Sequence, residues 1–108
     1  MAYTDKQEFK IPRHLILKGG VNVETITGVR TMTYKDSQVQ ILDNSTGSAL
    51  DCKLPAAKEG AFFFLHNAGT HDIHIRDADT TATYAILATG EGCMVASSST
   101  DYHLVFKA

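Results

Sequence analysis

Two of the five histidines in this 108-residue chain form its densest group of potential metal ligands. His71 and His74 lie three residues apart, with Asp72, Asp77 and Asp79 close to them in the sequence. On a β-strand, residues three apart point to opposite faces, so the two imidazoles would not converge on one ion. Asp77 and Asp79 resemble the opening of a calcium loop, but the glycine and distal glutamate of such a loop are missing. We therefore predict solvated surface residues and no metal site.

Nucleophilic catalysis is the second chemistry that the residue types allow. Ser97–Ser99 lie close to Asp101 and His103, which supplies the three residue types of a serine hydrolase. No Gly-x-Ser-x-Gly elbow surrounds any of these serines. Small polar residues in this arrangement are typical of a hairpin turn. We predict a turn here and no catalytic residue.

Two further candidates are a thiol dyad and a glycine-rich loop. Cys93 could pair with His66, but it follows a Gly-Glu-Gly turn and begins an apolar run, which indicates a thiol in the core. Thr89–Gly92 carries two glycines, yet it leads into a strand rather than a helix, so it lacks the helix N-terminus that binds phosphate. Neither motif predicts a cofactor site, and the sequence offers no enzyme active site.

The bulk composition is that of one globular domain. Hydrophobic residues make up 44% of the chain and charged residues 20%, and a second core would leave each half too small. The formal net charge of -2 gives no electrostatic attraction to nucleic acid. No apolar run approaches the roughly 20 residues of a membrane helix, and the N-terminus is too polar for a secretory signal. We expect synthesis in the cytoplasm.

The two cysteines, Cys52 and Cys93, are far apart and lack the spacing of a zinc site. In a cytoplasmic protein we favour buried reduced thiols over a disulfide between them.

Short strand-like runs alternate with turn formers after residue 20, and no stretch has the periodicity of an ordinary helix. Residues 29–34 and 38–42 predict a hairpin, and Leu50, Cys52 and Leu54 should point inward from a strand that Pro55 ends. Residues 61–65 are apolar without alternation, which predicts a central strand covered on both faces. Further strands are expected at 71–76, 84–87, 93–96 and 102–106. The predicted fold class is all-β, as a small antiparallel β-sandwich or β-barrel with an extended N-terminal arm.

The sequence divides into residues 1–20, the expected arm, and residues 21–108, the expected β-domain. Two interpretations of the arm remain open: a terminus that binds nothing, or a segment that orders on a partner. In the second, the apolar side chains of the arm would bind the partner, and some would add a strand to an open sheet edge. These candidate partner-binding residues are Phe9, Ile11, Pro12, Leu15, Ile16 and Leu17.

The order of features from about Gln38 to Phe106 carries a resemblance to a known family. The features are Leu54-Pro55, Glu59-Gly60, Asn67-Ala68-Gly69, Ile73-His74-Ile75, Gly90-Glu91-Gly92 before Cys93-Met94-Val95, and Ser99-Thr100-Asp101-Tyr102 before the last strand. In this order they resemble a domain of tailed-bacteriophage virion proteins, which include capsid decoration (cement) proteins and tail-fibre bases or tips. Tyr102 stands where a tryptophan is common in that pattern.

The resemblance implies a structural protein of the virion that forms a homotrimer on the outer capsid surface. Its arm would engage the major capsid protein and stabilise contacts between capsid subunits. Two alternatives remain: a trimeric tail-fibre or spike domain that binds host glycans, and a small cupin-like β-barrel that binds a metal or acts as an enzyme. The last would require the histidines to converge.

Overall fold

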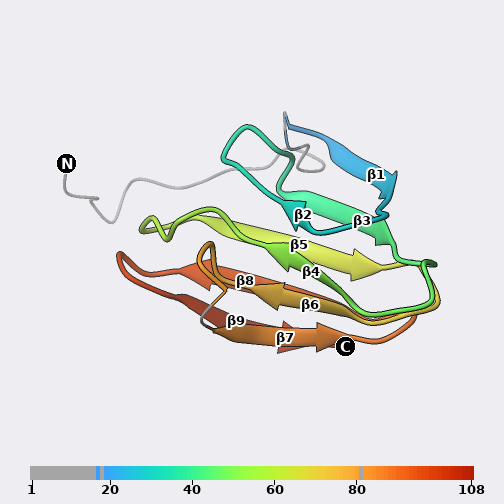
Figure 1. Ribbon diagram of the computed structural model, residues 1–108. Coiled ribbons are helices and arrows are strands. Elements are labelled where there is room, and N and C mark those ends of the chain that lie inside the picture. The colour runs from blue at the N-terminus through green and yellow to red at the C-terminus, as the bar shows by residue number, and fades with distance from the viewer. Residues whose placement is uncertain (1–16, 18, 81) are drawn as a thin grey trace.

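The computed structural model describes residue 17, residues 19–80 and residues 82–108 (Figure 1). This described part contains nine β-strands and no helix, which confirms the predicted all-β character. Within the same residues there is accordingly no helical segment of the length and apolarity needed to cross a membrane.

The strands form two open sheets. Sheet A has five strands in the order β1 (Val21–Thr25), β3 (Val39–Asp43), β5 (Phe62–Asn67), β8 (Gly92–Ser97) and β9 (Tyr102–Lys107). Sheet B has four strands in the order β2 (Arg30–Thr31), β4 (Leu50–Lys53), β6 (Ile73–Arg76) and β7 (Thr83–Leu87). From β1 to β6 the chain alternates between the two sheets, so each coil of chain contributes one strand to each sheet (Figure 1).

The expected antiparallel pairing is wrong for the first part of the chain. Among the described strands, the pairs β1–β3, β3–β5, β2–β4 and β4–β6 are parallel. Only the last strands pair antiparallel, in β5–β8, β6–β7 and β8–β9. Parallel pairing arises because successive strands of one sheet are separated by a full coil that passes through the other sheet. The sheets are therefore mixed.

The hairpin expected from residues 29–34 and 38–42 is also wrong, because β2 and β3 lie in different sheets. Between them, the Thr33 amide donates to Asp36 Oδ2 at 2.7 Å and the Asp36 amide donates to the Thr33 carbonyl at 3.0 Å. Among the described residues other than glycine only Thr80 has a positive φ, so this turn lacks the backbone of a tight hairpin. Met32 is buried in the core, which favours the crossing between sheets.

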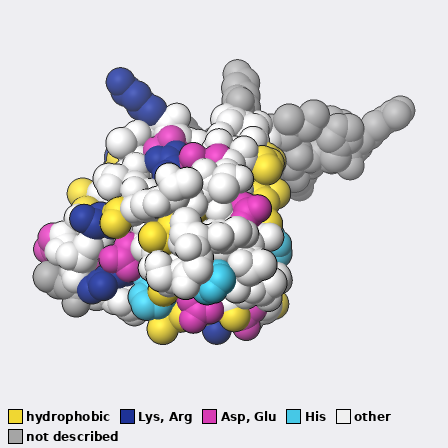
Figure 2. Space-filling view, turned by 45° about the vertical axis from the view of Figure 1, so that its right-hand side comes forward, with side chains coloured by type: hydrophobic (Ala, Val, Ile, Leu, Met, Phe, Trp, Pro, Cys, Tyr) yellow, Lys and Arg dark blue, Asp and Glu magenta, His cyan; other side chains and the backbone are white. Residues whose placement is uncertain are grey.

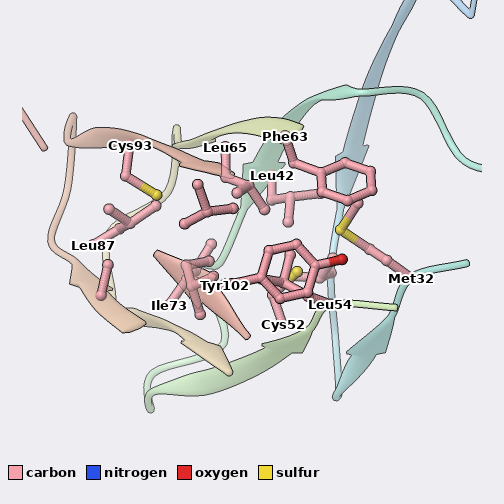
Figure 3. Packing of buried hydrophobic residues seen from close by; sticks show 14 residues of the cluster. Met32, Leu42, Cys52, Leu54, Phe63, Leu65, Ile73, Leu87, Cys93 and Tyr102 are labelled. Carbon is pink, nitrogen blue, oxygen red and sulfur yellow. The ribbon is translucent and has the colours of Figure 1, made fainter. Parts of the chain in front are cut away.

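The core lies between the two sheets (Figure 3). Leu42, Phe63 and Leu65 enter it from sheet A, and Ile73 and Leu87 enter it from sheet B. The inward direction predicted for residues 50, 52 and 54 is confirmed, since the second and third are buried and the first packs against the core. The strand predicted at the centre is β5, which occupies the middle of sheet A.

Two buried asparagines make the same turn in successive coils where the chain leaves sheet A for sheet B. The Asn44 amide donates to the carbonyl of Ser48, four residues on, at 2.9 Å, and the Asn67 amide donates to that of His71 at 2.7 Å. Each amide also bonds to a neighbouring coil or strand, Asn44 to the carbonyl of Asp72 and Asn67 to that of Leu87. The side chains thus supply hydrogen bonds that the buried backbone of the turn would otherwise lack.

These turns belong to an internal repeat, in which Leu42–Lys53 aligns without gaps on Leu65–Arg76. The repeat matches the pairing of β4 with β6, where Leu50 lies beside Ile73. The turns stack closely: a Cβ added to Gly69 would lie 2.3 Å from the backbone nitrogen of Asn44. Glycine at position 69 is therefore required by the contact between coils.

Candidate interaction surface

The outer face of sheet A carries a continuous apolar row. Side chains alternate between the two faces of a strand, so Phe63 and Leu65 enter the core while Phe62 and Phe64 point outward. Cross-strand partners lie on the same face, and the partners of Phe64 can be followed to both edges of the sheet. The row that results is Val21, Val39, Phe64, Met94 and Phe106, one residue from each of the five strands. We call it the apolar row.

The flanking rows of this face mix apolar side chains with histidines. Val23 and Ile41 lie on one side of the apolar row and are followed by His66, and Phe62 and Ala96 lie on the other side and are followed by His103. Phe62 and Phe64 pack edge to face, with ring centroids 5.9 Å apart and planes at 88°. The prediction that residues 61–65 are covered on both faces is therefore met only in part, because the outward phenylalanines are half-buried.

Exposure of large apolar side chains is concentrated at the two edges of sheet A. Eight large hydrophobic side chains are exposed in the described part of the chain, and five of them lie in the edge strands. In β1, Val21 is 55% and Val23 71% exposed; in β9, Leu104 is 42%, Val105 54% and Phe106 51% exposed. Single exposed hydrophobics are ordinary on protein surfaces, but a contiguous set marks an interaction site.

A hollow of about 250 Å³ interrupts the apolar face. Val39, Phe64 and Phe106 line it together with His66, and Gly92 opens it because that position has no side chain. A hollow of this kind, with mostly apolar walls, fits an apolar side chain better than a charged one.

The outer face of sheet B has the opposite character. Its half-buried side chains include Asp51 and Lys53 of β4 and His74 and Arg76 of β6. Asp51 lies 3.8 Å from His74 Nδ1 and 3.8 Å from an Arg76 nitrogen, so the two sheet-B strands are linked by weak charge pairs. Ile86 of β7 is the exposed apolar residue of this face. Charged, histidine and hydrophobic side chains are similarly interspersed on the surface seen in Figure 2.

Charge also gathers at the end of the molecule formed by β1 and β2. Arg30 Nε donates to Glu24 at 2.6 Å and Arg30 NH2 donates to Asp36 at 2.9 Å. The hydrogen bonds from Arg30 lower the pKa of both carboxyls, and the bond to Asp36 raises the pKa of Arg30. Asn22 of β1 donates to the fully buried Gln40 of β3 at 2.7 Å. The first coil is therefore held by these polar contacts in addition to the buried side chains of Ile26 and Met32.

The histidine group does not form a metal site in the described residues. His71 contacts the Thr70 hydroxyl through Nδ1 at 3.0 Å, whereas His74 faces Asp51 on the outer face of sheet B. No group of three or more His, Cys, Asp or Glu side chains placed to hold an ion occurs among residues 17, 19–80 and 82–108.

The serine cluster lies at the turn between β8 and β9, as predicted. The Ser98 amide donates to the Asp101 carbonyl at 2.8 Å and the Asp101 amide donates to Ser98 Oγ at 3.2 Å. Ser97 Oγ accepts from the Lys58 amide at 3.0 Å. These contacts close the turn.

Both cysteines are free and buried, as the sequence predicted. Burial raises the pKa of the Cys52 thiol to about 12 and that of Cys93 to about 11. Few thiolates exist at neutral pH when the pKa is this high, so neither cysteine is an activated nucleophile. The Thr89–Gly92 segment is the turn into β8, closed by the Glu91 amide, which donates to the Ala88 carbonyl at 3.0 Å.

Of the predicted partner-binding residues, Phe9, Ile11, Pro12, Leu15 and Ile16 lie outside the described residues. Leu17 is described and half-buried, and its carbonyl accepts a hydrogen bond from Gly20 at 3.0 Å.

The outer face of sheet A is not among the surfaces predicted from the sequence. The alternation of Val21 and Val23 with polar residues marks β1, and the excess of phenylalanine over the alternating pattern marks β5. Both signals were readable in the sequence. The pairing that joins them across five strands was not, because it depends on the order of strands in the sheet.

Comparison with known proteins gave no match: no protein-family model, curated protein sequence or solved structure corresponds to this chain.

Proposed function

We propose that this chain is a structural protein of a tailed-bacteriophage virion, a capsid decoration (cement) protein without enzymatic activity. In this proposal the two sheets form a β-sandwich body that assembles as a homotrimer on the outer surface of the shell. The body and the arm together bridge neighbouring major capsid proteins and stabilise their contacts. The proposal starts from the resemblance of residues 38–106 to virion β-domains.

The single observation that best supports an assembly role is the apolar face of sheet A. A five-stranded sheet with strands about 4.8 Å apart and about 17 Å long presents roughly 400 Å² on one face. Part of this face is apolar and exposed, mainly at Val21, Val23 and Phe106 along its edges, and contiguous exposed apolar surface favours contact with another protein. Both thiols lie in the core, and burial raises their pKa values, so neither thiol is an activated nucleophile. If this face joins copies of the chain, each assembled unit carries several shell-binding sites, and many modest contacts then act together on one shell.

The test is co-sedimentation of the purified full-length chain with emptied phage capsids, in their expanded and unexpanded forms. We expect saturable binding to expanded shells, where the outer sites are fully formed, and none to unexpanded ones. Bound protein should raise the temperature at which the shell dissociates. Absence of binding to expanded shells from the phage that encodes the chain would overturn the proposal.

A truncation locates the shell contact within the chain. The described contacts begin at Leu17 and Gly19, whose carbonyl accepts a 2.6 Å hydrogen bond from Ser37 Oγ. A chain lacking residues 1–16 keeps these contacts, so we expect it to remain folded by circular dichroism yet fail to co-sediment. Undiminished shell binding would show that the arm does not hold the partner.

One hollow favours the glycan-binding alternative. It measures about 310 Å³ and is lined by Tyr84, Tyr102, Pro55 and Asp101 among others. Tyr102 is buried in the core, but the partly exposed ring of Tyr84 and the Asp101 carboxylate offer an apolar surface and hydrogen-bond acceptors, which suit a sugar ring. Binding to a glycan array that is lost in Tyr84→Ala, with no binding to shells, would favour a tail-fibre or spike domain.

A further inference from the structure

The two edges of sheet A are alike in being apolar and in having one strand neighbour each. Among the described residues β1 pairs only with β3, and β9 pairs only with β8. Edge strands that must stay unpaired are usually protected by lysine, proline or a bulge. β1 has the sequence VNVET and none of these features, and its register with β3 is regular. An edge of this kind is suited to accept another strand.

The opposite edge presents apolar side chains on a bulged strand. The register of β8 with β9 shifts between Met94 and Val95, where Val105 is the extra residue of β9. Leu104, Val105 and Phe106 are consequently all exposed. This bulge and Lys107 at the end of β9 both disfavour pairing, but three consecutive apolar side chains in solvent favour a covered edge.

The directions of the two edge strands are compatible with joining one copy to the next. β1, β3 and β5 are mutually parallel, β8 runs opposite to β5, and β9 runs opposite to β8. Hence β9 runs in the same direction as β1. If β9 of one copy lay beside β1 of another, the new pair would be parallel, as β1 and β3 already are.

We propose that copies of this chain join head to tail, with β9 of one copy beside β1 of the next, and that three junctions close a ring. The inference rests on the proposed function for the number three; the junction itself rests on the two edges. A junction between unlike edges closes into a ring when the rotation between copies permits. The outer faces of sheet A turn toward the axis of the ring, since that orientation covers the apolar row.

The position of the apolar row indicates that a second copy of the chain covers this surface. It begins at Val21 on one edge and ends at Phe106 on the other, so in the ring it continues from copy to copy without interruption. A face of roughly 400 Å² is about half of the 800 Å² per partner typical of a stable complex. The two edge junctions that each copy makes supply additional contact. A second copy of the chain, which carries the same apolar row, therefore fits the chemistry of this surface.

The first test measures the oligomeric state of the full-length chain by sedimentation equilibrium. We expect a trimer for the wild type. Val23→Lys in β1 and Val105→Lys in β9 should each raise the dissociation constant by about 30-fold or more, as loss of a central contact does. The matched control is Ile86→Lys, an apolar residue 47% exposed on β7 of sheet B, which should leave the trimer unchanged. A monomeric wild type, or equal weakening by the control, would overturn the proposal.

A mixing experiment distinguishes a head-to-tail junction from one between like edges. The Val23→Lys chain keeps its β9 edge and the Val105→Lys chain keeps its β1 edge, so an equimolar mixture can form one intact junction. We expect a heterodimer in the mixture and monomers in each variant alone. Circular dichroism of each variant should match the wild type, because both side chains are more than half exposed. Absence of the heterodimer from a mixture of folded variants contradicts the junction.

The experiments can refute the proposed ring and the proposed function independently of each other. Shell binding by a wild-type monomer would refute the ring and leave the decoration role intact. A trimer disrupted by the edge variants that does not bind any shell would support the ring and refute the role on the capsid.

Discussion

The outer faces of the two sheets differ although their inner faces are alike. Sheet A presents the apolar row, which is half-buried in its middle and exposed at its ends, whereas sheet B presents the half-buried Asp51, Lys53, His74 and Arg76. Both sheets contribute inward residues that are almost completely buried, such as Leu65 and Ile75. Since the core is already filled from both sides, the phenylalanines on the outside of sheet A are not needed to fill it. In the proposed function, this difference makes sheet B the water-exposed face and sheet A the contact face.

The largest change in stability is expected for substitutions in the core, which test whether the inner faces of the two sheets are equivalent. Leu65→Ala in sheet A and Ile75→Ala in sheet B each remove a large side chain that is at most 2% exposed. Each should lower the free energy of unfolding by about 3 kcal/mol, measured by urea denaturation. A loss below about 1 kcal/mol for either residue would show that its sheet does not share the common core.

The next prediction concerns self-association and compares the outer face of sheet A with that of sheet B. Phe64→Arg on sheet A should weaken self-association by about 30-fold or more, because it places a charge in the middle of the apolar row. The loss of its edge-to-face contact with Phe62 should cost the monomer about 1 kcal/mol. The matched substitution on sheet B is His74→Arg, for which we expect unchanged association in analytical ultracentrifugation. Equal effects on the two faces would refute the distinction between them.

A smaller effect concerns the charges around Arg30 at the end formed by β1 and β2. Arg30→Met leaves Glu24 and Asp36 without their partner and should cost about 1 kcal/mol at pH 7, after allowance for partial exposure. Because Arg30 lowers the pKa of both carboxyls in the folded state, its contribution is present above their usual pKa values and is lost as they protonate. The difference between wild type and variant should therefore shrink between about pH 5 and pH 2.

Thermal unfolding across this pH range measures the effect, with Lys35→Met on the adjacent turn as the control. A difference that stays constant from pH 7 to pH 2 would mean that Arg30 acts through packing rather than through its charge.

The smallest effect is expected for the polar face itself. Asp51→Asn removes the charge that faces His74 and Arg76, both at 3.8 Å and partly exposed. We expect a change below about 0.5 kcal/mol that disappears in 1 M salt, since such pairs are screened. If the substitution lowered the free energy of unfolding by more than about 1 kcal/mol, the Asp51 charge would be part of a stabilising ion pair on sheet B and not of a solvated surface.

Local pattern was sufficient to predict most strands but not their partners. The runs around residues 39–43, 62–67 and 102–107 are strands, because alternation and turn formers act over a few residues. The parallel arrangement was missed, since a crossing between sheets uses the same polar turn residues as a hairpin. The 23-residue offset between Leu42–Lys53 and Leu65–Arg76 would have revealed it, because each copy of the repeat contains the same asparagine turn.

The candidate site could be predicted even less fully. Absence of a catalytic motif is visible in the sequence, but a surface depends on which side chains share a face. Phe64 and Phe106 lie 42 positions apart and meet only through β8. Turn chemistry, by contrast, is local, and the interpretation of Ser97–Ser99 as a turn was correct. Local motifs can therefore be read from the sequence, whereas the membership of a surface requires the strand order.

The stacked asparagine turns have a consequence for the order of folding. The amides of Thr70 and His71 both donate to the carbonyl of Asn44 at 2.9 Å, so the second turn takes its shape from the first. Each coil closes a loop of similar, short length, which keeps the entropic cost of adding it low. Such an arrangement lets structure spread from one coil to its neighbour along the chain, and the edge strand β9, which is last in the sequence, completes the sheet.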